Sequence, residues 1–152
     1  MRTPPPGATR VEQSTRREVN QKISRRTQAT VASAAVSLDH IERRLAELDR
    51  EWDIERALQT NFGIINVASI ILGGLVARPW FLLTGVAAGF MAKHALEGWC
   101  PPVPVLRRLG FRTAREIAQE RYALKALRGD FEDVDASKPH QALAAAAIDH
   151  GR

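Results

Sequence analysis

A long apolar block at residues 62–96 constrains the fold of this chain more than any other feature. Between residues 67 and 92 the only side chain with a full charge is Arg78, whereas the rest of the chain is polar and strongly charged. Pro79 follows Arg78. Proline lacks a backbone donor and disfavours helix at the residue before it. The block therefore predicts two apolar helices joined by a turn at Arg78 and Pro79.

The length of the two apolar segments bears on whether they cross a membrane or are buried in protein. A spanning helix needs about 20 mostly apolar residues, whereas runs of roughly 10 to 14 are more often buried in protein. Residues 58–77 and 79–97 are long enough if uncharged polar residues lie at the interface and if Lys93 and His94 extend toward the headgroups. We therefore expect an all-α protein with a two-helix transmembrane hairpin over residues 58–99.

Aromatic and basic residues around the two segments indicate their orientation. Trp80 and Trp99 lie at opposite ends of the second segment, as interfacial anchors do. The connecting turn carries only Arg78. Basic residues are frequent on both flanks, namely Arg43, Arg44, Arg50, Arg56, Lys93, Arg107, Arg108, Arg112, Arg115 and Arg121. By the positive-inside rule both termini face the cytoplasm, so we expect an inner (cytoplasmic) membrane protein in contact with lipid.

The net charge of +5 does not by itself indicate a nucleic-acid partner. The sequence has no zinc-finger spacing, RNA-binding aromatic signature or glycine-rich phosphate loop. Membrane topology explains the basic flanks more simply, and we expect neither a nucleic-acid partner nor a cofactor.

Small residues recur at intervals of four in both apolar segments. They are Ser69, Gly73 and Ala77 in the first segment and Gly85 and Gly89 in the second. In lipid, helices associate through close packing at small residues, because the hydrophobic effect does not drive them together. These positions predict helix–helix contacts, either within one hairpin or between two hairpins.

Residues 28–57 show the spacing of a heptad repeat. The apolar seam comprises Val31, Ala34, Leu38, Ile41, Leu45, Leu48 and Trp52. No proline or glycine interrupts this region, which predicts one continuous cytoplasmic helix. Two alternatives remain open for the seam: a parallel coiled-coil dimer, or an amphipathic helix that packs on its own chain.

The remaining segments carry few apolar residues. Residues 1–27 are rich in Pro, Arg, Thr, Ser and Gln, which predicts a disordered basic arm, either solvated or bound to anionic lipid. Residues 100–131 predict a juxtamembrane segment and an amphipathic helix, opened by a capping box at residues 113–116. This helix lies either on the membrane surface or against the heptad helix. Residues 132–152 predict a mobile tail with a short helix at 141–148.

Part of the chain resembles a known family of membrane domains. Glu55-Arg56-Ala57-Leu58, a glycine-containing first segment, and a second segment that closes in GWCPPVPVLRRLGFRT are similar to the YgaP-like inner-membrane domain family. The resemblance covers about residues 54–113, and Pro102 and Pro104 depart from the family pattern. It implies a two-helix inner-membrane domain, dimeric and sometimes fused to a rhodanese sulfurtransferase domain. It implies no established reaction for the domain alone.

Cys100 is the single cysteine and the one candidate for chemistry. The residues after it, Pro-Pro-Val-Pro, supply few backbone N–H groups for a persulfide cradle, which argues against an independent nucleophile. The four histidines show no ligand spacing with Cys100, so no metal is expected. The sequence favours a non-enzymatic, self-associating membrane anchor or interaction module. The alternatives are a thiol- or persulfide-handling accessory that acts through Cys100 with a separate sulfurtransferase, and a soluble helical bundle.

Overall fold

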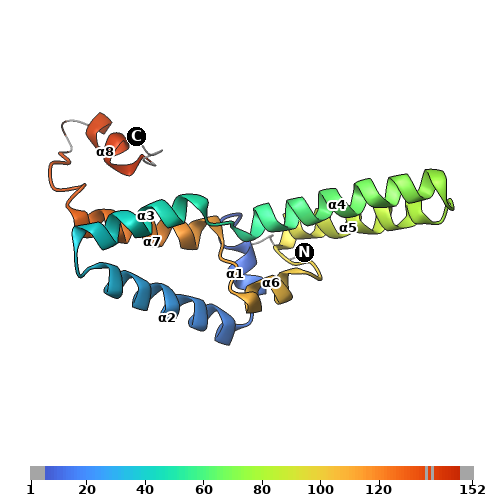
Figure 1. Ribbon diagram of the computed structural model, residues 1–152, viewed down its shortest axis with the longest axis horizontal. Coiled ribbons are helices and arrows are strands. Elements are labelled where there is room, and N and C mark those ends of the chain that lie inside the picture. Colours follow the sequence, from blue (N-terminus) through green and yellow to red (C-terminus); the bar gives the residue numbers. More distant parts are fainter. Residues whose placement is uncertain (1–5, 136, 138, 148–152) are drawn as a thin grey trace. The chain divides into compact units, whose positions relative to one another are not determined.

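The computed structural model of the protein describes residues 6–135, 137 and 139–147. These residues form helices and turns without any strand, which confirms the all-α expectation (Figure 1). The helices are α1 (Arg10–Ser14), α2 (Arg17–Ala34), α3 (Leu38–Arg50), α4 (Ile54–Leu75), α5 (Trp80–Glu97), α6 (Val103–Leu109), α7 (Ala114–Arg128) and α8 (Pro139–Ala146).

The chain divides into two compact units, each assembled from two stretches of sequence. Unit 1 combines Met1–Lys22 with Trp52–Arg115 and so contains α1, the first residues of α2, and α4, α5 and α6. Unit 2 combines Ile23–Glu51 with Glu116–Arg152 and contains α3, α8 and most of α2 and α7.

The apolar block forms a helical hairpin of α4 and α5, which pack against each other along unit 1 (Figure 1). Asp53 caps the start of α4, where its carboxylate accepts the Arg56 N–H with an N···O distance of 2.6 Å. The turn falls at residues 76–79, as the sequence predicts. Helix α5 ends at Gly98, whose φ of 72° lies in the left-handed region that glycine adopts readily.

The base of the hairpin is folded, and this corrects the expected disordered arm at residues 1–27. Helices α1 and α2 begin within this segment, and Val11 of α1 is buried in a small apolar core of unit 1. The core comprises Val11, Ile54, Leu58, Cys100 and Val103, with Leu106 and Phe111 packed against it. The expectation of disorder is wrong for residues 6–27, because contacts with distant parts of the chain, such as Arg10 with Glu55 and Ser14 with Gly98, stabilise a segment that has few apolar residues. Residues 1–5 lie outside the described part of the chain.

The expected continuous helix over residues 28–57 is also wrong, because it is broken at residues 35–37 and 51–53. Ser37 caps α3 by accepting the His40 N–H, and Asp53 caps α4. Serine and aspartate side chains compete with the backbone for N–H groups, so they favour helix starts over helix interiors. The breaks divide the predicted heptad seam between α2, α3 and a loop.

Most of the seam is buried in the core of unit 2. This core contains Ala34, Ile41, Leu45 and Leu48 from the seam and Ile117 and Leu124 from α7, with Val31 packed against it. Leu38 and Trp52 are exposed instead. Of the two alternatives for the seam, the structure has the helix that packs on its own chain. Likewise α7 packs on α3 through these residues, which was one of its two predicted placements.

Charged side chains reinforce the α3–α7 contact inside unit 2. Arg44 Nε donates to Glu120 Oε1 at 2.7 Å, and Arg121 Nη1 pairs with Asp49 Oδ1 at 2.6 Å. Arg44 Nη1 also lies 2.7 Å from Glu47 Oε2, and Arg44 Nη2 lies 3.5 Å from Glu51 Oε2. Of these residues, Arg44, Asp49 and Glu51 lie at the e and g positions of the predicted heptads, which pair between chains in a coiled coil; here they pair within one chain.

The expected short helix near the C-terminus is present as α8. The Lys125 ammonium donates to the backbone carbonyls of Ala145, at 2.9 Å, and Ala147, close to the end of this helix. Cations near a helix C-terminus interact favourably with the helix dipole. Residues 136, 138 and 148–152 of the expected tail lie outside the described part of the chain.

Candidate functional site

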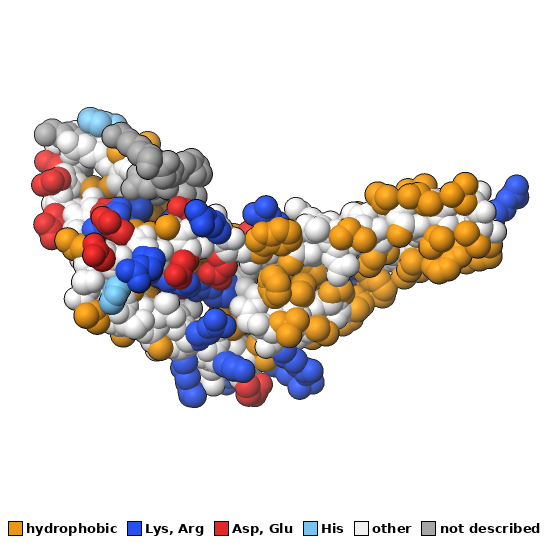
Figure 2. Space-filling view, in the orientation of Figure 1, with side chains coloured by type: hydrophobic (Ala, Val, Ile, Leu, Met, Phe, Trp, Pro, Cys, Tyr) orange, Lys and Arg blue, Asp and Glu red, His pale blue; other side chains and the backbone are white. Residues whose placement is uncertain are grey.

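The outer surface of the hairpin is apolar and exposed (Figure 2). Leu75 is 82% exposed and Leu82 is 73% exposed. Other large exposed apolar side chains of the hairpin are Ile64, Val67, Ile70, Ile71, Val76, Trp80, Phe81, Leu83, Val86, Phe90 and Leu96. Soluble monomers rarely expose a contiguous apolar patch larger than a few hundred Å², and larger patches mark contacts with proteins or membranes. The hairpin surface is therefore the candidate functional site.

Among the described residues, one stretch, Leu38–Leu75, contains a window long and apolar enough to cross a membrane. Because α3 is rich in charged residues, the apolar window lies in α4. Only 17% of the window is buried, whereas the core helix of a soluble protein is mostly buried. Helix α5 carries Lys93 and Glu97 near its end and does not meet the same criterion.

Two of the predicted small residues lie at the contact between α4 and α5. Ser69 is buried, and its hydroxyl oxygen is 2.5 Å from that of Thr84. A Cβ atom on Gly73 would lie 2.8 Å from the Phe81 ring, so only glycine lets the ring approach this closely. Ser69 and Gly73 therefore make contacts within the hairpin, which was one of the two alternatives for the small residues.

The other three small residues lie on the exposed surface of the hairpin. Ala77, Gly85 and Gly89 are all exposed. A Cβ atom on Gly85 or Gly89 would meet nothing within 4 Å. These residues take no part in the packing of α4 on α5, and Gly85 and Gly89 are open to an approaching helix.

The two predicted anchor residues lie at the two ends of α5. Trp80 begins the helix, next to the turn, and is exposed. Trp99 follows the helix and is half-buried, with Lys93 Nζ 5.8 Å from its ring centroid. The ammonium of Lys93 also pairs with Glu97 one turn later. The expected separation of the two tryptophans along the hairpin is thus present.

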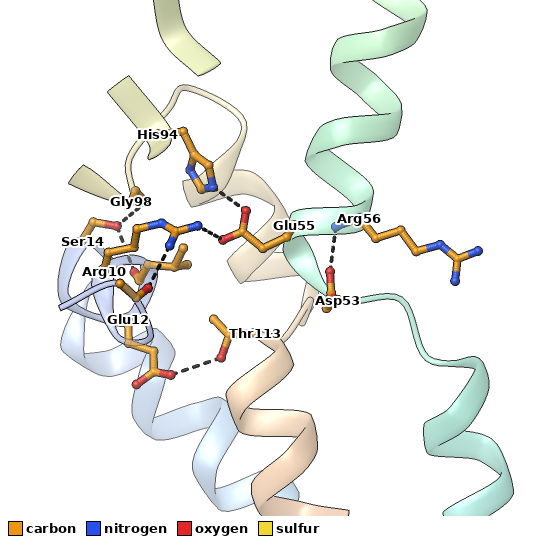
Figure 3. Close-up of polar contacts among 11 residues, drawn as sticks. Arg10, Glu12, Ser14, Asp53, Glu55, Arg56, His94, Gly98 and Thr113 are labelled. Atoms are coloured by element: carbon orange, nitrogen blue, oxygen red, sulfur yellow. Dashed lines mark hydrogen bonds and ion pairs between the residues drawn. The ribbon is translucent and has the colours of Figure 1, made fainter. Parts of the chain in front are cut away.

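A polar cluster holds the base of the hairpin together (Figure 3). Glu55 of α4 accepts two hydrogen bonds, from Arg10 Nη2 of α1 and from His94 Nε2 of α5, each at 2.9 Å. The hydrogen bond from His94 lowers the pKa of the Glu55 carboxyl, and the charges of His94 and Arg10 add to this effect against the opposing effect of burial. His94 is only 2% exposed, so the expectation that it extends toward the headgroups is wrong.

Helix α1 is fastened to this base by several further contacts (Figure 3). The Ser14 hydroxyl donates to the Gly98 carbonyl at 2.7 Å. A Cβ atom on Gly98 would lie 2.3 Å from the Arg10 backbone, so α1 approaches as closely as a glycine permits. The Thr113 hydroxyl donates to Glu12 at 3.1 Å. In the first turns of α2, Asn20 Oδ1 accepts from Arg107 Nη2 at 2.8 Å. The sequence did not predict these contacts, because polar residues of this kind are equally common in segments that stay exposed to solvent.

Cys100 lies in the apolar core of unit 1 and is 5% exposed. Its neighbours in that core are Val11, Ile54, Leu58 and Val103. In the described part of the chain, His, Cys, Asp and Glu side chains form no group of three that could hold a metal ion. The His94 side chain also lies beside the Cys100 thiol and interacts with it, so Cys100 is a buried thiol with an imidazole neighbour.

Comparison of the chain with protein-family models, with curated proteins and with solved structures finds no match.

Proposed function

We propose that the α4–α5 hairpin inserts into a membrane and that the protein is a non-enzymatic anchor or interaction module. The observation that carries this proposal is the exposed apolar surface, which continues over both helices of the hairpin. The charged contacts between helices of the hairpin lie at its base, where Glu55 accepts hydrogen bonds from His94 and Arg10, whereas the contact between Ser69 and Thr84 farther along the hairpin is uncharged. A soluble bundle would instead bury the hairpin surface against other helices.

The dimensions of the hairpin suit a bilayer. At a rise of 1.5 Å per residue, the 22 residues of α4 are about 33 Å long and the 18 residues of α5 about 27 Å. Because Leu58 belongs to the base, the free part of α4 is about 25 Å long, slightly less than the hydrocarbon core of about 30 Å. Modest bilayer thinning and the long side chain of Arg78 at the turn make up the difference.

The proposed orientation places both termini in the cytoplasm and the Arg78 turn at the far side of an inner membrane. Its support is the concentration of basic residues on both flanks of the hairpin, and the single basic residue in the turn. The resemblance of residues 54–113 to the YgaP-like inner-membrane domains is a second reason for this expectation.

Self-association is part of the proposal, but through the hairpin rather than through the heptad seam. The seam residues Ile41, Leu45 and Leu48 are already buried against α7 of the same chain. Gly85 and Gly89, by contrast, are exposed one helical turn apart on α5. In lipid, such a pair lets two helices approach closely and pack. A second copy of the hairpin is the proposed partner of this face.

Charged substitutions on the exposed hairpin surface test the proposal. Ile70→Arg with Val86→Arg places two charges at mid-hairpin, where each costs about 2.5 to 3.5 kcal/mol in a bilayer. We expect wild-type protein to float with phospholipid vesicles and the double variant to stay at the bottom of the gradient.

A matched control uses Val36→Arg with Leu127→Arg, two exposed apolar residues of unit 2. This control variant is expected to float like wild type. Equal flotation of all three proteins would contradict insertion through the hairpin, and equal loss in both variants would point to general misfolding.

The alternative function, thiol or persulfide handling with a separate sulfurtransferase, needs access to the Cys100 sulfur. Its burial in the unit 1 core argues against such access. Maleimide labelling of the folded protein in membranes discriminates the two functions. Labelling as fast as that of a free thiol would favour the sulfur-handling alternative, and labelling only after denaturation is the expected result.

A further inference from the structure

The two units differ in their charge. Unit 1 has twelve Lys and Arg residues and five Asp and Glu residues, a net charge of +7. Unit 2 has ten and twelve, a net charge of −2. The whole basic excess of the chain therefore belongs to the unit that carries the exposed apolar hairpin.

Several of the basic side chains of unit 1 form ion pairs or hydrogen bonds within the unit. Arg10 pairs with Glu55, Arg115 pairs with Glu12, and Arg107 is buried and bonded to Asn20. A second group is exposed: Arg16, Arg17, Lys22, Arg56 and Arg108. Within the described residues none of these five forms an ion pair, although Arg56 stacks on Trp52 at 4.4 Å. We call these five residues the basic surface.

The basic surface belongs to the base of the hairpin. Arg16 and Arg17 lie where α1 passes into α2, Arg56 is in the first turn of α4, and Arg108 is in the last turn of α6. Helix α1 contacts α5, and α6 contacts α4. Figure 2 shows Lys and Arg side chains gathered over the start of α2 and over α6, next to the apolar side chains of the hairpin. An apolar surface thus passes directly into a cationic one within unit 1.

We propose that the basic surface binds the phosphate groups of acidic phospholipids in the leaflet through which the hairpin enters. This inference rests on the proposed insertion of the hairpin. A bilayer is the one occupant that is apolar along the hairpin and anionic at its base, whereas a nucleic acid would leave the apolar surface exposed. Each basic side chain near an anionic membrane contributes about 1 kcal/mol, roughly fivefold in binding. The unpaired state of these cations leaves them available for that contact.

The preference of the membrane-bound protein for acidic lipid is the quantity to measure. In the full chain with Trp52→Phe and Trp80→Phe, Trp99 at the base of α5 is the one remaining tryptophan, and its fluorescence is measured. The protein is reconstituted in bilayers that contain brominated phosphatidylglycerol with plain phosphatidylcholine, or the reverse. Quenching of Trp99 then reports which lipid lies next to the base. We expect phosphatidylglycerol to be favoured about fivefold or more.

Substitutions separate the basic surface from overall charge. Arg17→Gln with Arg108→Gln, and Arg16→Gln with Lys22→Gln, are each expected to lower the preference severalfold without abolishing it, because each pair leaves three of the five cations in place. Arg43→Gln with Arg50→Gln removes the same charge from exposed residues of unit 2 and is expected to leave the preference unchanged. An equal loss in the unit 2 variant would overturn the inference, because net charge alone would then set the preference.

The outcomes distinguish this inference from the proposed function. Quenching without any lipid preference would overturn the inference and leave hairpin insertion intact. Absence of quenching by either brominated lipid would overturn both. Loss of the preference in inorganic phosphate but not in chloride at the same ionic strength would assign the basic surface to free anions instead of lipid headgroups; we expect the two salts to have equal effects.

Discussion

Glu55 links three helices at the base of the hairpin. Its carboxylate joins α1 to α5 because it accepts hydrogen bonds from Arg10 and from His94 at the same time. Hydrogen bonds that involve charged groups contribute more than neutral ones, and the loss of one partner leaves the other without compensation. The polar cluster therefore stabilises the packing of α1, α4 and α5 at the base of the hairpin, in addition to the small apolar core there.

Glu55→Gln is expected to destabilise unit 1 by about 1 to 3 kcal/mol near neutral pH. The lowered pKa of Glu55 means that its contribution to stability is present above its usual value of 4.5 and is lost as the pH falls through the folded value. The difference between wild type and variant should therefore shrink in acid. Thermal unfolding in detergent micelles, followed by circular dichroism at several pH values, measures it.

Glu97→Gln is the matched control, because Glu97 is an exposed carboxylate that pairs with Lys93 one turn away. Exposed pairs of this kind contribute about 0.3 to 0.5 kcal/mol. A loss as large as that of Glu55→Gln, or a loss that grows in acid, would contradict the account of the base.

At the scale of elements, hydropathy predicted the hairpin because an apolar run broken by Arg78-Pro79 is a local property of the sequence. The ends of the heptad region were not predicted, because Ser37 and Asp53 are polar residues of a kind that helices also tolerate on exposed faces. Their role as caps is seen in the structure, where each side chain accepts a backbone N–H from the first turn of the helix that follows. Helix α1 was missed because its stability comes from contacts with Glu55 and Gly98, far away in the sequence.

Leu45 and Leu38 provide a direct test of how the heptad seam is used. Leu45 is 7% exposed in the core of unit 2, whereas Leu38 is 62% exposed. Leu45→Ala is expected to lower the stability of unit 2 by about 2 to 5 kcal/mol, the usual cost of emptying a core position. Leu38→Ala is expected to change it little. Denaturant unfolding provides the free energies, and light scattering of the same samples provides the mass.

Neither leucine variant is expected to change the oligomeric state, because the seam packs within one chain. If Leu45→Ala dissociated an oligomer while the fold was retained, the result would favour a coiled-coil dimer formed through the seam. Equal destabilisation by the two variants would contradict the position of the seam in the core.

At the scale of the whole molecule, the sequence shows which segments are apolar and which are charged. It does not show which residues of an apolar segment are buried within the hairpin and which lie on its surface. Ser69 and Gly73 shared a spacing with Gly85 and Gly89, yet the first pair packs inside the hairpin and the second lies on its surface. Spacing alone cannot separate these roles, because residues four apart always share a helix face. Which small residues are buried depends on which face of α4 and which face of α5 are turned toward each other.

The exposed glycines lead to a prediction about assembly. Gly85→Leu with Gly89→Leu is expected to shift the protein in micelles toward monomer, because larger side chains keep two helices apart. Gly74→Leu is the control, since a Cβ atom there also meets nothing within 4 Å but lies on α4. Analytical ultracentrifugation measures the mass. Unchanged association in the double variant, or an equal effect at Gly74, would argue against an α5 interface.

The central claim is that the exposed hairpin lies in a membrane, and alkaline carbonate extraction of membranes from cells that express the full chain tests it most directly. High pH strips proteins that are held at a membrane surface by charge, but it does not remove helices embedded in the hydrocarbon. We expect the protein to remain in the membrane pellet together with a known integral protein. Release into the supernatant together with a peripheral marker would contradict it.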